Sequence, residues 1–153
     1  MSHEEILIQR KAVIEEARTW CGTPFHHRAA VKGAGVDCAC LLAESYNRSL
    51  GTEFEVPEYY DQWHLHRMDE MYLNYLDKSG FIEILPKDKQ PADLAISRIG
   101  HLFSHGAIIV DWPQVIQSES RGGGKVFFIR DAYSNWYFQA RKIKFYSWKR
   151  WHE

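Results

Sequence analysis

The chain has 153 residues and a formal net charge of −1 at pH 7, with 45% hydrophobic and 25% charged residues. This length suits one well-cored domain, and we expect residues 1–153 to form a single domain. The near-neutral charge gives no reason to expect nucleic-acid binding, and no apolar run approaches the length of a membrane span. Three cysteines, an odd number, exclude a disulfide framework. We expect synthesis in the cytoplasm, without a signal peptide.

The charge is unevenly distributed along the chain. Residues 51–93 carry four Lys/Arg and ten Asp/Glu, a net of −6, whereas residues 121–153 carry eight and two, a net of +6. Two interpretations are open: solvated outer faces of the elements, or a basic wall that faces an acidic polymer or a partner protein.

Helical patterns fill the first half of the chain. Ser2 and Glu5 form a capping-box pattern, and the apolar spacing after them predicts an amphipathic helix to about Trp20. Its predicted buried face consists of Ile6, Arg10, Val13, Ile14, Ala17 and Trp20. Residues 22–36 are predicted to form a loop.

Two more helices are expected after this loop. Asp37 is a good N-cap and Gly51 a fitting residue after a helix end, which predicts a helix from Cys38 to about Leu50. A third helical pattern covers roughly residues 62–77.

The second half of the chain reads as short strands separated by turn signals. We expect strands over residues 93–99, 106–111, 114–118, 125–130 and 141–148, with a hairpin turn at the Gly122–Gly124 triplet. Helices followed by strands predict an α+β fold, in which the N-terminal helices pack on a central antiparallel β-sheet.

Cys38 is a candidate nucleophile because it would occupy the first turn of the second helix. The unpaired N–H groups and the dipole there favour an anion, so we expect a lowered thiol pKa and fast alkylation of Cys38 near neutral pH. The same N–H groups could hold an oxyanion. Cys40 would point away from Cys38 around the helix, and both Cys40 and Cys21 are expected to be core fillers.

A nucleophilic cysteine needs a base, and the base needs an orienting group. His105 opens an apolar strand and is the best placed of the eight histidines. Gln117 lies twelve residues further on, beyond a plausible turn at Trp112-Pro113. In a hairpin of the two strands, Gln117 could accept the ring N–H of His105 and fix its tautomer.

Two stretches, GTPFHHRAAVKGAGVDCACLL and HLFSHGAIIVDWPQVIQS, together resemble the NlpC-type cell-wall peptidases, most closely their phage-associated branch. These are papain-like cysteine peptidases. The resemblance implies a papain-like fold with Cys38 as nucleophile, His105 as base and Gln117 as orienter. It also brings in Phe25, His26, Asp37 and Ser104 as candidates for substrate binding or for the oxyanion.

The chain departs from the family pattern at several positions. The third catalytic residue is commonly His but is Gln117 here, and Phe25 stands where many relatives carry a Tyr. Ala39 and Cys40 replace the usual Ser and Gly, and Ala92 replaces a usual Gly.

The resemblance implies hydrolysis of a peptidoglycan stem peptide, by a protein that acts in a phage virion tail or at the bacterial cell wall. Phage tail proteins are the expected partners, beside the peptide substrate. Two alternatives are open: a thiol amidase or acyltransferase on the same fold, and a non-catalytic tail assembly module. We expect no cofactor and no metal site, since the pairs His26-His27 and His64-x-His66 lack partners at zinc spacing.

Overall fold

The structure is a computed structural model that describes residues 1–58 and 70–153. Its helices in these ranges are α1 (His3–Thr19), α2 (Cys38–Leu50) and α4 (Met71–Lys78), and its short 3-10 helices are η1 (Pro86–Asp88), η2 (Ala132–Ser134) and η3 (Lys149–His152). The predicted third helix is confirmed only from Met71 onward, and it ends at Lys78. Residues 62–69 of that prediction, with His64 and His66, lie outside the described residues.

Local capping sets the ends of the first two helices, as the sequence predicts. The Ser2 side chain accepts from the Glu5 N–H and the Glu5 carboxylate accepts from the Ser2 N–H, both at 3.1 Å. In α2, Asp37 Oδ1 accepts from the Cys40 N–H at 2.9 Å. Gly51 ends α2 with a φ of 72°, a conformation that favours glycine.

Six antiparallel strands form the sheet, in the order β3-β8-β4-β5-β6-β7. Their bounds are β3 (Phe81–Ile84), β4 (Leu94–Ile99), β5 (Leu102–Asp111), β6 (Gln114–Ser118), β7 (Val126–Ile129) and β8 (Ile143–Trp148). The α+β prediction with an antiparallel sheet is confirmed, as is the glycine turn between β6 and β7.

Two strand predictions need correction. The strand that carries His105 begins at Leu102 and not at residue 106, so His105 lies within β5 rather than at its mouth. The predicted loop over residues 22–36 contains a two-stranded sheet, β1 (Ala30–Val31) and β2 (Gly35–Val36). The sequence did not predict β1, β2 or β3. Strands this short give little periodic signal.

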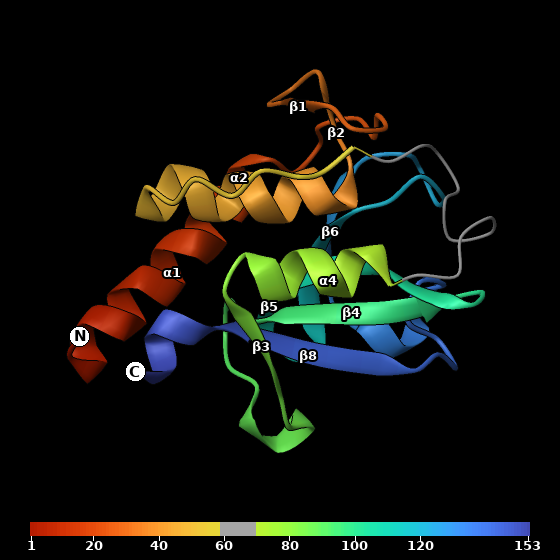
Figure 1. The fold of residues 1–153 in the computed structure, drawn as a ribbon. Helices are drawn as coiled ribbons and strands as arrows, with labels where there is room; N and C mark the ends of the chain where they lie inside the picture. Colours follow the sequence, from red (N-terminus) through yellow and green to blue (C-terminus); the bar gives the residue numbers. More distant parts are fainter. Residues whose placement is uncertain (59–69) are drawn as a thin grey trace.

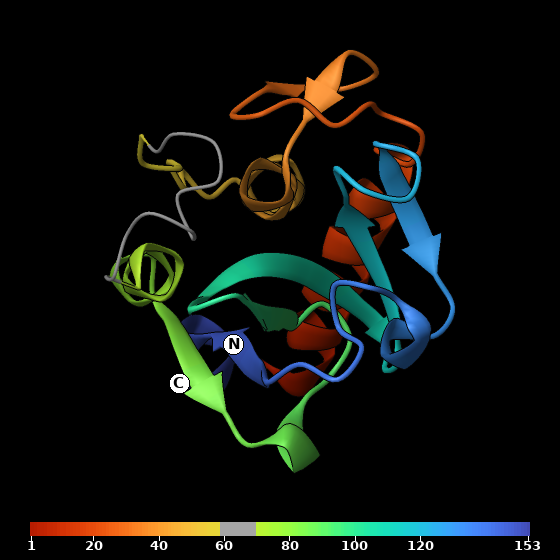
Figure 2. The ribbon, with the colours of Figure 1, turned by 90° about the vertical axis from the view of Figure 1, so that its right-hand side faces the viewer.

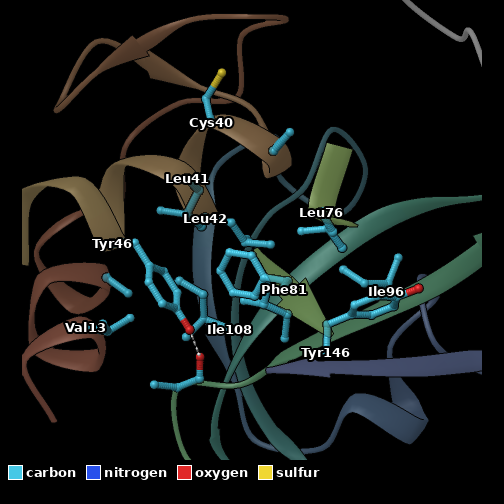
Figure 3. Packing of buried hydrophobic residues seen from close by; sticks show 14 of the residues in the cluster. Val13, Cys40, Leu41, Leu42, Tyr46, Leu76, Phe81, Ile96, Ile108 and Tyr146 are labelled. Carbon is cyan, nitrogen blue, oxygen red and sulfur yellow. Dashed lines mark hydrogen bonds between the residues drawn. The ribbon is translucent and has the colours of Figure 1, made fainter. Parts of the chain in front are cut away.

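The main core lies between the helices and the sheet. Figure 1 shows α1 and α2 on one side of the sheet, and Figure 2 shows the sheet curving beneath α2. Val13, Leu41 and Ile108 meet there with exposures of 0%, and Tyr46 donates to the Ala92 carbonyl at 2.7 Å (Figure 3). The C-terminal segment closes on α1, where Trp151 Nε1 donates to Gln9 Oε1 at 2.9 Å.

A second cluster fills the opposite face of the sheet. It contains Ala107 and Ile109 of β5, Val115 of β6, and Tyr137 and Phe138 from the segment after η2. Because alternate residues of a strand face opposite sides, His105 shares this face with Ala107 and Ile109. His105 is therefore packed by the segment that follows η2.

The two cysteines predicted to fill the core behave differently. Cys40 is buried and belongs to the main core cluster, so its predicted role as a core residue is confirmed. Its sulfur points away from Leu41 and Leu42 (Figure 3). Cys21 is exposed, so its assignment to the core is wrong. It follows the last turn of α1, beyond the face that Ala17 and Trp20 bury.

No helix within residues 1–58 and 70–153 is long and apolar enough to cross a membrane. That residues 1–153 make one domain stays a prediction.

Candidate active site

Cys38 is the first residue of α2, directly after the N-cap residue Asp37. It is half-buried, and its sulfur lies 3.9 Å from the carbonyl oxygen of Ser104 in β5. The N–H groups of Gly106 and Ala39 also donate toward the sulfur. The thiol thus contacts the strand on both sides of His105, through the residue before it and the residue after it.

A β-bulge shapes this part of β5. His105 pairs with Ser97 of β4 but Phe103 pairs with the next residue, Arg98, so that Ser104 is an extra residue on β5. Bulges bend a strand and re-aim its side chains, and they are frequent beside active sites. Here the extra residue is the one whose carbonyl meets the Cys38 sulfur.

The expectation of a lowered Cys38 pKa is wrong for this structure. Burial of the sulfur, followed by the nearby Asp37 carboxylate, raises the pKa of the Cys38 thiol to about 12. The N–H groups of Gly106 and Ala39 and the Tyr72 hydroxyl act in the opposite direction. Desolvation outweighs these donors, so Cys38 is a neutral thiol at pH 7.

We therefore expect slow alkylation of Cys38. With a pKa of about 12, its thiolate fraction at pH 7.5 is about three orders of magnitude below that of a free cysteine, whose pKa is about 8.5. Iodoacetamide at pH 7.5, followed by mass analysis of the peptides, should label the exposed Cys21 first and Cys38 much later. Faster labelling of Cys38 than of Cys21 would restore the idea of an activated thiolate.

His105 and Gln117 are brought together as the hairpin prediction requires. His105 Nε2 lies 2.9 Å from Gln117 Oε1, and both side chains are buried, at 4% and 0% exposure. The ring of His105 also stacks on Tyr137, with centroids 4.1 Å apart. Burial lowers the pKa of His105 to about 4, against the hydrogen bond to Gln117, which raises it. His105 is thus a neutral imidazole at pH 7 and can accept a proton.

The thiol contacts the backbone on either side of His105. Within the described part of the chain, no hydrogen bond joins Cys38 Sγ to the His105 ring; the sulfur contacts the flanking peptides instead. Catalytic hydrogen bonds are often long in free enzymes and tighten when substrate binds. The pair therefore remains a candidate for acid–base chemistry.

Beyond Gln117 lie two polar residues that the sequence analysis did not single out. Gln117 Nε2 donates to Glu119 Oε2 at 2.7 Å and to Asn135 Oδ1 at 3.1 Å. Asn135 Nδ2 in turn donates to Glu119 Oε2 at 3.2 Å. The i, i+2 spacing of Gln117 and Glu119, which directly follows β6, was a signal for Glu119, but the approach of Asn135 depends on the tertiary fold.

Tyr72 of α4 is a further residue at the site that sequence reasoning missed. Its hydroxyl is close enough to the Cys38 sulfur to lower the pKa of the thiol, and it lies over Gly106, where a side chain would collide with it. A small pocket of about 40 Å³ opens beside Tyr72. Its lining is largely apolar and consists of Cys38, Ala39, Val56, Pro57, Met71, Tyr72, Tyr75 and Ser104.

The other predicted site residues have varied positions. Asp37 is 2% exposed and caps α2 through its bond to the Cys40 N–H. Its other oxygen, Oδ2, accepts from the Arg28 N–H at 2.7 Å. Ser104 offers its carbonyl to the thiol. The half-buried Phe25 forms a backbone bridge with Val36, and the exposed His26 packs over Gly35. That any of these four binds substrate stays a prediction.

A basic, aromatic rim borders the His105 side of the site. Trp136 is 42% exposed and its ring lies between two guanidinium groups, 4.0 Å from that of Arg121 and 4.3 Å from that of Arg141. Arg141 is close enough to His105 to lower its pKa. In the part of the chain that the structure describes, no three His, Cys, Asp or Glu side chains gather as they would around a metal ion.

No family model matches the sequence, and no curated protein matches it. Solved structures do resemble the fold. The NlpC/p60 domain of the peptidoglycan hydrolase SagA superposes with a TM-score of 0.61 at 17% identity, over 88% of this chain and 96% of that one. The peptidoglycan hydrolase RipB of Mycobacterium tuberculosis has a TM-score of 0.61 at 14% identity, over 96% of this chain and 68% of that one.

A third similar structure is RipD of Mycobacterium tuberculosis, described as a non-catalytic NlpC/p60 domain protein adapted to peptidoglycan binding. It has a TM-score of 0.54 at 16% identity, over 91% of this chain and 96% of that one. Identities this low show the fold alone. The expected NlpC-type, papain-like fold is thereby confirmed.

Proposed function

We propose that this chain, which has the papain-like fold of NlpC/p60 domains, is a thiol peptidase that cuts peptidoglycan stem peptides. Cys38 is the nucleophile, His105 the base and Gln117 the residue that orients it. The observation that carries the proposal is the contact of the Cys38 sulfur with Ser104 and Gly106, on either side of His105. SagA and RipB, both named as peptidoglycan hydrolases, support the substrate class.

Because both groups start neutral, the proton and the nucleophile move together. The Cys38 sulfur bonds to the scissile carbonyl carbon while its proton passes to the His105 imidazole. The imidazolium then gives this proton to the amine nitrogen as the C–N bond breaks, which leaves a thioester on Cys38. Water attacks the thioester and gives one proton to the imidazole, which returns it to the departing sulfur.

The first turn of α2 supplies donors for the carbonyl oxygen as it gains charge. The Cys38 N–H belongs to the helix end whose amides lack intrahelical acceptors, so it is a donor for a carbonyl oxygen bound beside the sulfur. The Tyr72 hydroxyl, which lowers the pKa of the Cys38 thiol, is a second candidate donor. Tyr72 reaches the site from α4. Phe25, at the position where many NlpC-type relatives carry a Tyr, has no hydroxyl that could serve as a donor.

Charge favours an acidic peptide over a neutral one. The rim formed by Arg121, Trp136 and Arg141 lies next to His105 and belongs to the segment with a net charge of +6. Guanidinium groups bind carboxylates through paired hydrogen bonds. This agrees with a peptidoglycan stem peptide, which carries free carboxylates.

A second function, peptidoglycan binding without cleavage, is favoured by one observation. The Cys38 thiol has a pKa raised to about 12, and among the described residues no hydrogen bond joins it to the His105 ring. RipD shows that this fold also occurs in a non-catalytic protein.

Phage tail association rests only on the sequence resemblance, and co-purification with tail proteins would test it.

Incubation with purified muropeptides, followed by mass analysis of the fragments, tests the peptidase. We expect the wild-type chain to release fragments and Cys38→Ala to release none. Cys21→Ala, which changes an exposed cysteine, is the matched control and should cleave like the wild type. Cleavage that survives Cys38→Ala would remove Cys38 from the mechanism, and retention of muropeptides without cleavage would favour the binding function.

A further inference from the structure

The orientation of the Gln117 side chain decides which nitrogen of His105 carries the proton. An amide offers an oxygen that only accepts and a nitrogen that only donates. Gln117 meets His105 at 2.9 Å on one end, and Glu119 and Asn135 on the other. Whichever end faces His105 therefore sets the tautomer of the ring.

The partners at the far end of Gln117 admit only its nitrogen. The Glu119 carboxylate oxygen, 2.7 Å away, is an acceptor and sits in a side chain that is 5% exposed. Asn135 also presents its oxygen, because that same atom accepts from the Tyr137 N–H at 3.0 Å. An inverted Gln117 would set its oxygen against both of these acceptors in a buried site, at a cost of about 1–3 kcal/mol for each unmade bond.

We infer that Glu119 is a positioning residue for His105: it holds the Gln117 amide nitrogen, so that the amide oxygen faces His105 Nε2 and the ring keeps its Nδ1 unprotonated. Nε2 must then donate to Gln117 Oε1. Nδ1 is left as the acceptor that can take a proton from the Cys38 thiol.

The residues around Glu119 hold it in this role. Gly122 approaches Glu119 Oε1 so closely that a Cβ there would lie 3.0 Å from it. The next residues reach the same imidazole by another route, since the N–H groups of Ser120 and Arg121 each donate to the Tyr137 hydroxyl at 3.0 Å. Residues 119–121 thus fix both the Gln117 partner of His105 and the Tyr137 ring stacked on it.

The tautomer is measurable without any enzymatic assay. Nitrogen-15 NMR of the full chain at pH 7, with the His105 signals identified from a His105→Asn sample, separates a pyrrole-like Nε2 from a pyridine-like Nδ1. We expect the wild type to hold the Nε2–H form. Glu119→Met, which removes both acceptor oxygens, should give a mixture of tautomers, and Glu119→Gln, which keeps one, should restore the wild-type signals.

The catalytic consequence rests on the proposed function. Given peptidase activity, Glu119→Met should lower kcat about tenfold or more with KM little changed, by analogy with groups that orient metal-binding histidines. Glu119→Gln should recover most of this loss. Without peptidase activity in the wild type the proposed function fails, but the NMR result still tests the positioning role.

Two outcomes would overturn the inference. One is an Nδ1–H tautomer in the wild type, which needs no variant and so is unaffected by a folding defect in Glu119→Met. The other is a folded Glu119→Met protein whose His105 signals match those of the wild type.

Discussion

Replacing Arg10 with Met is expected to lower the free energy of unfolding by about 3–5 kcal/mol, the range for removing one partner of a buried ion pair. Arg10 is 3% exposed and its Nη1 lies 2.8 Å from Asp93 Oδ1. The same nitrogen donates to the Pro91 carbonyl at 2.9 Å, and the guanidinium lies over the Trp151 ring at 4.2 Å. Among the described residues Arg10 alone forms an ion pair with Asp93, so its removal would leave a carboxylate at 0% exposure without that cation.

Two further variants make this measurement specific. Lys11→Met removes an exposed partner of Glu15, 3.8 Å away, and should cost no more than about 0.5 kcal/mol. The double variant Arg10→Met with Asp93→Asn removes the stranded charge and should be more stable than Arg10→Met alone. Urea unfolding of the full chain gives all of these values. A loss below about 1 kcal/mol for Arg10→Met would contradict a buried ion pair of this strength.

This ion pair links α1 to the start of the strand that lies beside the candidate site. Arg10 joins α1 to Asp93, which directly precedes β4, and β4 pairs with the part of β5 that carries His105. Ala92, beside Asp93, has a φ of 75°, in the left-handed region that favours glycine. The tight backbone at residues 91–93 is therefore held by α1 and by the C-terminal segment together.

Local chemistry made the first two helices predictable from the sequence. Their ends depend on side chains within three or four residues, such as Ser2 with Glu5 and Asp37 with Cys40. The hydrophobic spacing also placed Arg10 on the buried face of α1, although its partner Asp93 is 83 residues away. The predicted contact of His105 with Gln117 followed from a hairpin of adjacent strands.

What the sequence did not reveal depends on segments that meet only in the fold. β3 pairs with β8 across more than sixty residues, Tyr72 reaches the thiol from α4, and Asn135 reaches Gln117 from the far side of the glycine turn. The prediction of a lowered Cys38 pKa failed for a different reason. A helix start supplies N–H donors that the sequence shows, but the burial that opposes them is set by the β5 bulge and α4.

Stability should fall as the pH drops from about 6.5 to 4, because His105 is buried as a neutral ring. Burial lowers its pKa to about 4 in the folded chain, against about 6.5 in an unfolded one. Between these values the unfolded state binds a proton that the folded state does not, so stability rises with pH. His105 thus contributes about 3 kcal/mol to the free energy of unfolding above pH 6.5. This contribution is lost as the pH falls from about 6.5 to about 4.

The variant His105→Asn isolates this contribution from those of the other histidines. The stability difference between wild type and variant, from urea unfolding at a series of pH values, should be constant above pH 6.5. It should then shrink by about 1.4 kcal/mol per pH unit toward pH 4. His101→Asn, which removes an exposed histidine, should keep the wild-type slope, and a pH-independent difference for His105→Asn would mean that the ring titrates normally.

The same burial bears on the proposed chemistry. An imidazole that stays neutral down to about pH 4 is an available base between pH 4 and about 6.5, where a histidine of ordinary pKa would be mostly protonated. The acid limb of kcat/KM, which reports ionisations of the free enzyme, should therefore fall near pH 4 rather than near 6.5. A limb near 6.5 would place His105 in a more solvated environment during turnover, and would favour an ion-paired thiolate over the concerted transfer that two neutral groups require.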